Sequence, residues 1–284
     1  MAYRGHLIAA LLVTLSTLVA GCATVAGRRA IPARSGYAPV NGLNVYYEIH
    51  GEANGSSPPL VLLHGGGSTI ETSFGKLLPI LSGNRQVVAF EQQGHGRTAD
   101  ADRPFSFTQS ADDAAGLLLY LGIPKADFFG YSNGGQIAIE IAIRHPELVR
   151  KLIVESAMYS REGAEPAFWE SFGHARLEDM PAELRESYIR IAPHPEDLPV
   201  FFAKSVERMK TFKGWTPESI RSITAPVLVV TGDRDIVRPE HAVAMFRLLP
   251  NARLAVLPDT DHMAIVDRAE WLCPMIERFL AGQE

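Results

Sequence analysis

The chain has 284 residues, of which 46% are hydrophobic and 21% are charged. This length and composition are typical of a globular protein with a sizeable core, built as one α/β domain with an insertion or as two small domains. The net charge of −5, with no basic block beyond one short arginine-containing linker, argues against nucleic-acid binding.

The first 22 residues form a predicted signal peptide rather than part of the fold. Arg4 is the only formally charged residue before Cys22, and residues 7–21 are an uncharged run. That run is short for a membrane span but suits the hydrophobic region of a signal peptide. The segment Leu18-Val19-Ala20-Gly21-Cys22 resembles a bacterial lipobox, which implies that Cys22 is lipidated and becomes the mature N-terminus. A simple secretory signal or an uncleaved anchor is the alternative.

The predicted location follows from that segment. We expect a protein of the bacterial cell envelope that is lipid-anchored on the periplasmic side, or one that is secreted. Its membrane contact would be the N-terminal lipid alone. If Cys22 is acylated, Cys273 is the one cysteine left, and its apolar helical surroundings indicate a buried structural thiol.

Residues 23–36 are predicted to be a tether, because they are small or basic and show no periodicity. The folded domain is expected to span residues 37–284. It opens on Asn41-Gly42, a strong signal for a two-residue hairpin turn, after which apolar and polar residues alternate through residues 43–49.

Strand and helix patterns then alternate along the chain. Short apolar strands are expected at residues 59–64, 86–90, 127–131, 152–154, 226–231 and 254–257. Helices are expected at residues 72–81, from Ser106-x-x-Gln109 to about Leu121, at 136–144, at 241–249 and at the end of the chain. Uniformly apolar strands that alternate with helices predict an α/β fold, a doubly wound and mostly parallel sheet with both faces covered.

Residues 158–223 interrupt this alternation, because they contain no convincing buried strand. They carry several aromatic residues on helix-like segments of mixed polarity, namely Trp169, Phe172, Tyr188, Phe201, Phe202, Phe212 and Trp215. We expect an inserted helical cap over the carboxyl edge of the sheet. Most of these aromatics are expected to pack the cap onto the core, and some of them to line a substrate pocket.

Gly130-Tyr131-Ser132-Asn133-Gly134 lies between a strand pattern and a helix pattern, as a nucleophile elbow does. A turn this tight strains the serine backbone and needs small neighbours so that strand and helix can approach closely. It also places Ser132 at a helix N-terminus, which favours a developing negative charge.

A serine nucleophile needs a base and an acid that orients the base. Candidates follow the elbow in the order Ser, Asp, His, which is the order in doubly wound hydrolases. The segment Gly232-Asp233-Arg234-Asp235 follows one predicted strand, and Asp261-His262 follows the next. Spacing alone leaves both Asp233 and Asp235 open as the acid.

Five blocks of residues carry a family resemblance, and they occur in the expected order. They are His64-Gly65-Gly66, Gly94-His95-Gly96, Gly130-x-Ser132-x-Gly134, Gly232-x-x-Asp235 and Asp261-His262. The chain from Tyr37 to about Ala281 is therefore similar to serine hydrolases of the α/β-hydrolase fold, in the compact branch with a helical cap.

The resemblance implies a role for each matching residue. Ser132 would be the nucleophile, His262 the general base and then acid, and Asp235 the orienting carboxylate, with Asp233 left as a turn or supporting residue. The backbone N–H groups of Gly66 and Asn133 would form the oxyanion hole. The Asn133 side chain would make the pocket more polar. No cofactor is implied, and no cluster of residues has a spacing that predicts a metal site.

The expected function is hydrolysis of a small-molecule carboxylic ester, or a related acyl bond, through an acyl-enzyme. On the same residues, lactone, amide or carbon–carbon bond hydrolysis and perhydrolysis are alternatives. A lipid-anchored binding protein that has lost activity is an alternative of another class. Glu155, at a strand end near the site, is expected to form an ion pair with a cap arginine rather than to act in the pocket.

Overall fold

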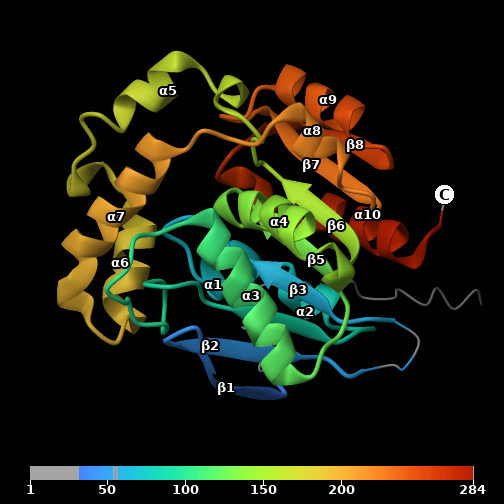
Figure 1. Ribbon diagram of the computed structural model, residues 1–284, viewed down its shortest axis with the longest axis horizontal. Coiled ribbons are helices and arrows are strands. Elements are labelled where there is room, and N and C mark those ends of the chain that lie inside the picture. The colour runs from blue at the N-terminus through green and yellow to red at the C-terminus, as the bar shows by residue number, and fades with distance from the viewer. Residues whose placement is uncertain (1–31, 54, 56, 284) are drawn as a thin grey trace, which may run out of the picture.

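A computed structural model describes residues 32–53, 55 and 57–283. The predicted signal peptide, Cys22 and residues 23–31 of the predicted tether lie outside these ranges. The described chain forms an eight-stranded sheet in the order β1-β2-β4-β3-β5-β6-β7-β8, with helices on both faces (Figure 1). This arrangement is the predicted doubly wound α/β architecture.

The strands are β1 (Arg34–Val40), β2 (Leu43–His50), β3 (Leu60–Leu63), β4 (Val87–Phe90), β5 (Ala126–Tyr131), β6 (Val149–Glu155), β7 (Val227–Arg234) and β8 (Ala252–Asp261). The pairs β1–β2 and β2–β4 are antiparallel, and all other neighbours are parallel. Strands β3, β4 and β5 are buried throughout, as expected for a sheet covered on both faces.

The hairpin between β1 and β2 turns at the predicted dipeptide. Asn41 and Gly42 have φ angles of 48° and 82°, which a two-residue hairpin turn of type I′ requires. Strand β1 begins at Arg34, earlier than the expected domain start at Tyr37. The predicted tether is therefore too long at its C-terminal end, because the register of β1 against β2 extends to Arg34 and Ile49.

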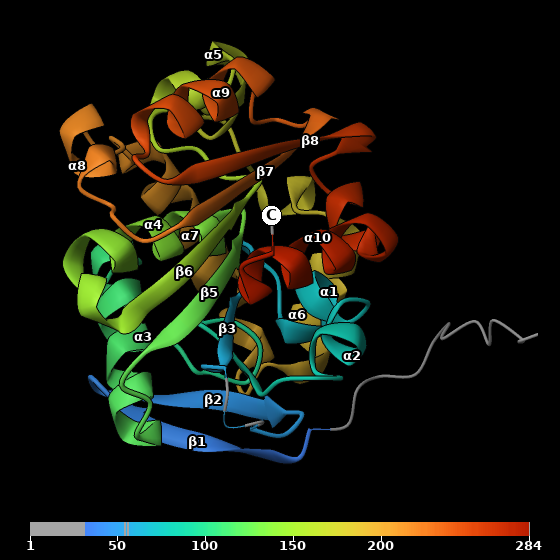
Figure 2. The same cartoon turned by 90° about the vertical axis from the view of Figure 1, so that its right-hand side faces the viewer.

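The sheet separates two apolar cores, and helices cover each core on its outer side. One face is covered by α3 (Phe107–Leu121), α4 (Asn133–Arg144), α8 (Pro217–Arg221) and α9 (Pro239–Leu248), and the other by α1 (Ile70–Phe74), α2 (Leu78–Leu81) and α10 (Ala269–Ala281) (Figure 2). The prediction of a single helix at residues 72–81 is wrong. Two short helices replace it, because α1 ends at Gly75. None of the described helices is long and apolar enough to cross a membrane.

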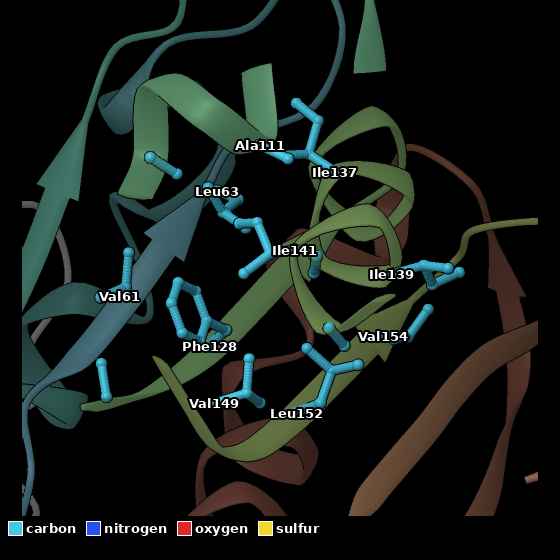
Figure 3. Close-up of a cluster of buried hydrophobic side chains, with 14 of the residues drawn as sticks. Val61, Leu63, Ala111, Phe128, Ile137, Ile139, Ile141, Val149, Leu152 and Val154 are labelled. Atoms are coloured by element: carbon cyan, nitrogen blue, oxygen red, sulfur yellow. The ribbon is translucent and has the colours of Figure 1, made fainter. Parts of the chain in front are cut away.

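The central helix α4 is buried on almost every side, as its apolar sequence predicts. Ile137 and Ile141 pack with Phe128 of β5 and Leu63 of β3 in the core between the sheet and α3 and α4 (Figure 3). This packing holds the N-terminus of α4 against the end of β5. The elbow residue Ser132 lies at that junction.

The strand order reverses direction at β3, and this reversal positions the site. From β3 the chain moves to β4 on one side through α1 and α2, and from β4 it crosses to β5 on the other side through α3. The connections after β3 and β5 therefore diverge at their carboxyl ends. Open α/β sheets bind ligands in the crevice that such a reversal leaves.

The inserted segment carries α5 (Pro166–Ser171), α6 (Ala182–Ile191) and α7 (Leu198–Thr211), which gather at one side of the molecule (Figure 1). We call these helices and their connections the cap. Its two ends meet where Ser160 pairs with Gly214 as an isolated bridge. The expected boundary at residue 223 is too late, because Ile220 and Ile223 pack into the core of the main domain.

Candidate active site

The elbow glycines are required by close backbone contacts. A Cβ atom on Gly130 would lie 2.2 Å from the Gly134 carbonyl oxygen, and one on Gly134 would lie 1.9 Å from the Leu63 oxygen. Ser132 itself has a φ of 53°, a positive value that residues other than glycine rarely adopt. Its backbone N–H donates to the Glu155 carbonyl at 2.8 Å, which supports the strained turn.

The structure brings three of the predicted site residues into one hydrogen-bonded chain. Ser132 Oγ lies 2.9 Å from His262 Nε2, and His262 Nδ1 lies 2.7 Å from Asp235 Oδ1. The Tyr131 hydroxyl donates to the His262 carbonyl at 2.7 Å and so holds the loop after β8 against the elbow. This arrangement can transfer the serine proton to the imidazole and stabilise the imidazolium that results.

Asp235 and Asp233 have different environments, although the sequence spacing alone could not decide which of them is the orienting acid. The Asp235 carboxylate is buried and also accepts hydrogen bonds from the Ser156 hydroxyl and the Val237 N–H. Burial alone would raise the pKa of Asp235, but its bonds with His262 and Ser156 keep that pKa below its usual value. Asp233 is exposed and accepts from the Thr260 N–H at 3.1 Å, which supports the turn at the end of β8.

The predicted oxyanion donors lie in the loop after β3 and at the start of α4. Gly66 lies in the connection after β3, and no described residue accepts a hydrogen bond from its N–H. Asn133 is the first residue of α4, where N–H groups lack acceptors within the helix. A Cβ atom on Gly66 would lie 3.5 Å from the Asn133 Cβ, so the two residues are in close contact.

The amide nitrogen of Asn133 is bonded to a neighbouring side chain, whereas its amide oxygen has no hydrogen-bond partner among the described residues. Its amide donates to Gln92 Oε1 at 2.9 Å, while the Gln92 amide donates to the His64 carbonyl at 2.7 Å. His64 Nδ1 bonds the Gly65 carbonyl, and its Nε2 accepts the Gln92 N–H. Burial lowers the pKa of His64 to about 4, so this histidine is neutral and holds the glycine loop in place.

Glu155 does not form the expected ion pair with a cap arginine. The residue is 1% exposed, and neither carboxylate oxygen has a hydrogen-bond partner among the described residues. Burial, with a smaller contribution from the charge of Asp235, raises the pKa of Glu155 to about 8. A carboxyl in this position is therefore protonated at neutral pH, because no cation among the described residues pairs with it.

Replacing Glu155 with glutamine should remove a pH dependence of stability. The unfolded carboxyl loses its proton near its ordinary pKa of 4.5, whereas the folded one keeps it to about pH 8. The contribution of Glu155 to the free energy of unfolding therefore falls as pH rises between these values, with a slope that approaches about 1.4 kcal/mol per pH unit. Urea unfolding between pH 4.5 and 8 measures this contribution. The free energy of unfolding of Glu155→Gln should lack it, so that its difference from wild type changes with pH. The exposed control Glu52→Gln should keep the wild-type pH dependence. Parallel curves for wild type and Glu155→Gln would contradict the assignment.

A cavity of about 460 Å³ opens above Ser132, between the main domain and the cap. The expected cap aromatics divide into two groups. Phe172, Phe201 and Phe202 line the cavity, whereas Trp169, Tyr188, Phe212 and Trp215 do not line it and pack in or against buried apolar clusters. The buried residue Arg208 of α7 also lines the cavity, and the sequence analysis missed it. Its position in a helix of mixed polarity offered no signal that distinguished it from a surface arginine.

Cys273 lies buried in α10 as a free thiol, in line with the predicted structural role. Burial, more than the nearby carboxylates, raises the pKa of the Cys273 thiol to about 12. Such a thiol is not a nucleophile at neutral pH. Within the described ranges, no group of three or more histidine, cysteine, aspartate or glutamate side chains could hold a metal ion.

Comparisons with known proteins agree with this architecture. A family model described as "Alpha/beta hydrolase family" matches residues 60–274. A 2-hydroxymuconate semialdehyde hydrolase from Pseudomonas sp. (strain CF600) is 28% identical over 80% of this chain and 88% of its own length. A proline iminopeptidase from Clostridium botulinum is 24% identical over 86% of this chain and 97% of its own. The structure of an enol-lactonase from Burkholderia xenovorans LB400 superposes with a TM-score of 0.71 at 22% identity, over 86% of this chain and 99% of that one.

Proposed function

The chain belongs to the alpha/beta hydrolase family, and we propose that it is a serine hydrolase that cleaves a small-molecule carboxylic ester through an acyl-enzyme. The observation that carries the proposal is the hydrogen-bonded chain from Ser132 through His262 to Asp235, at 2.9 Å and 2.7 Å. A serine and a histidine that line a cavity, connected in this order to a buried aspartate carboxylate, have the geometry of nucleophilic acyl transfer.

The proposed reaction uses two half-reactions on the same residues. Ser132 Oγ attacks the ester carbonyl as its proton moves to His262 Nε2, and the Gly66 and Asn133 N–H groups stabilise the oxyanion. The tetrahedral intermediate collapses, and His262 returns the proton to the departing alcohol. Water then attacks the acyl-enzyme with His262 as base, which releases the carboxylic acid and restores Ser132. Asp235 holds the imidazole in the required tautomer throughout.

Which type of acyl bond the protein cleaves is a separate question from the class of enzyme. The matched relatives include a 2-hydroxymuconate semialdehyde hydrolase and a proline iminopeptidase, so lactone, amide and carbon–carbon bond hydrolysis and perhydrolysis remain alternatives on the same residues. Turnover of a panel of esters, lactones and amides of graded acyl length distinguishes them.

Turnover of neutral short-chain p-nitrophenyl esters and labelling by a fluorophosphonate test the proposed enzyme class. Both should be observed for the purified wild-type protein, because the cavity leaves Ser132 accessible. Absence of both would favour a binding protein that has kept the fold without the activity.

We propose in addition that the protein is held in the bacterial cell envelope by a lipid on Cys22. The support is the lipobox-like segment at residues 18–22. Because acyl chains supply about 0.8 kcal/mol per buried CH₂, removing the acylated thiol should free the protein from membranes. Cell fractionation of Cys22→Ser tests this: the variant should move to the soluble fraction, and continued membrane sedimentation would contradict lipid anchoring.

A further inference from the structure

Arg208 places a buried positive charge in the wall of the candidate active site. The residue lies on α7 of the cap, is 6% exposed, and lines the cavity above Ser132. Most other residues of the cavity wall are apolar or neutral, and Asp179 is the other lining residue with a fixed charge. The Asp179 carboxylate is half exposed and already bonded to the Arg176 backbone N–H.

No described residue makes a hydrogen bond or an ion pair with the Arg208 guanidinium. Its Nε is buried without a partner, and its charge lies over the rings of Phe105 and Phe107, at 5.3 Å and 5.4 Å from their centroids. Burial lowers the pKa of Arg208 to about 10, so the side chain stays charged at neutral pH. Aromatic faces compensate a buried cation only in part, and an anion with hydrogen-bond acceptors would compensate it fully.

The charge lies beside the predicted oxyanion hole. Arg208 Nη2 is 3.8 Å from the position that a Cβ atom on Gly66 would occupy, and the same position is 3.5 Å from the Asn133 Cβ. A substrate whose carbonyl oxygen meets the Gly66 and Asn133 N–H groups would therefore carry its neighbouring atoms past the guanidinium. Planar guanidinium groups bind carboxylates through two parallel hydrogen bonds.

We propose that Arg208 forms a carboxylate-binding subsite, so that the preferred substrates are esters that bear a free carboxylate near the scissile carbonyl. This inference rests on the proposed function, because it places the carboxylate relative to the carbonyl that Ser132 attacks. The apolar cavity wall, which includes Phe172, Phe202 and Met209, would contact the hydrocarbon part of such a substrate.

Matched substrates isolate the charge of the carboxylate. The monoethyl esters of succinate, glutarate and adipate are each compared with the ethyl ester of the monocarboxylic acid in which a methyl group replaces the carboxylate. Wild-type kcat/KM should favour the charged ester for at least one chain length. Arg208→Met should reduce kcat/KM for that ester about 10- to 100-fold, the usual size of a lost charge-assisted bond. Its kcat/KM for the neutral ester should change much less, and Arg208→Lys should fall between.

Arg161→Met is the matched control, because Arg161 also stacks on an aromatic ring of the cap, that of Trp169, but does not line the cavity. It should leave the ratio of charged to neutral turnover unchanged. An equal fall for both esters in Arg208→Met would assign Arg208 to packing of the cap and overturn the subsite. A wild-type preference for the neutral ester at every chain length would also overturn it.

Binding of free glutarate separates this inference from the proposed function. Glutarate should raise the unfolding temperature of the wild-type protein and of Arg161→Met, but not that of Arg208→Met, because only a ligand bound to the folded state stabilises it. If glutarate binds in this way without any ester turnover, the subsite stands and the proposed reaction fails. If esters turn over without glutarate protection or charge preference, the reaction stands and the subsite fails.

Discussion

Replacing Ser132 with alanine will reduce kcat for a p-nitrophenyl ester by about 10⁶-fold, the size of effect seen when a serine hydrolase loses its nucleophile. The substitution removes the oxygen that lies 2.9 Å from His262 Nε2 and leaves the proposed oxyanion donors in place. Residual hydrolysis would come from those donors and from substrate binding alone. Steady-state release of p-nitrophenol measures the effect.

Covalent labelling provides the second readout for Ser132. A fluorophosphonate should label the wild-type protein and fail to label Ser132→Ala, while the exposed control Ser222→Ala should be labelled like wild type. Turnover that survives in Ser132→Ala would show that another group carries the reaction. An unchanged unfolding temperature excludes misfolding as the cause of the loss.

Asp235→Asn should reduce kcat by about 10⁴-fold, because an asparagine can hold His262 in the wrong tautomer. The carboxylate accepts a hydrogen bond from His262 Nδ1, with 2.7 Å between Nδ1 and Oδ1, and an amide NH₂ in its place would donate to that nitrogen instead. The pH dependence of kcat, measured with the same ester, should also change, because the imidazolium loses its counter-charge.

Asp233→Asn is the matched control for this substitution. Asp233 is exposed and accepts a hydrogen bond from the Thr260 N–H. Substitutions at such exposed positions usually have small effects, so replacing this carboxylate with an amide should reduce kcat less than about tenfold. The opposite ranking of the two variants would transfer the role of orienting acid to Asp233. Equal losses in both would indicate damage to the loop after β7.

Most of the fold and the order of the candidate catalytic residues could be predicted from local patterns. Asn41-Gly42 predicts its hairpin because few residue pairs tolerate positive φ twice in succession. Gly130 and Gly134 predict the elbow for a related reason, since a Cβ atom at either position would overlap backbone atoms. In both cases the steric constraint acts within a few residues, so the sequence carries it directly.

Other predictions failed where distant segments decide the outcome. The cap boundary at residue 223 was wrong because Ile220 contacts the main core rather than the cap helices. The expected ion pair of Glu155 was wrong because its buried carboxylate has no partner among the described residues.

The amino-acid sequence by itself determined the alternation of strands and helices, the strained turn at Ser132 and the chain order of the serine, aspartate and histidine. These features depend on backbone sterics and on apolar periodicity, which are properties of neighbouring residues. Only the tertiary structure decided that Asp235 rather than Asp233 meets His262, that buried Glu155 has no hydrogen-bond partner among the described residues, and that Arg208 reaches the loop of Gly66. Such contacts join loops and helices far apart in the chain, and their distances depend on the packing of the whole domain.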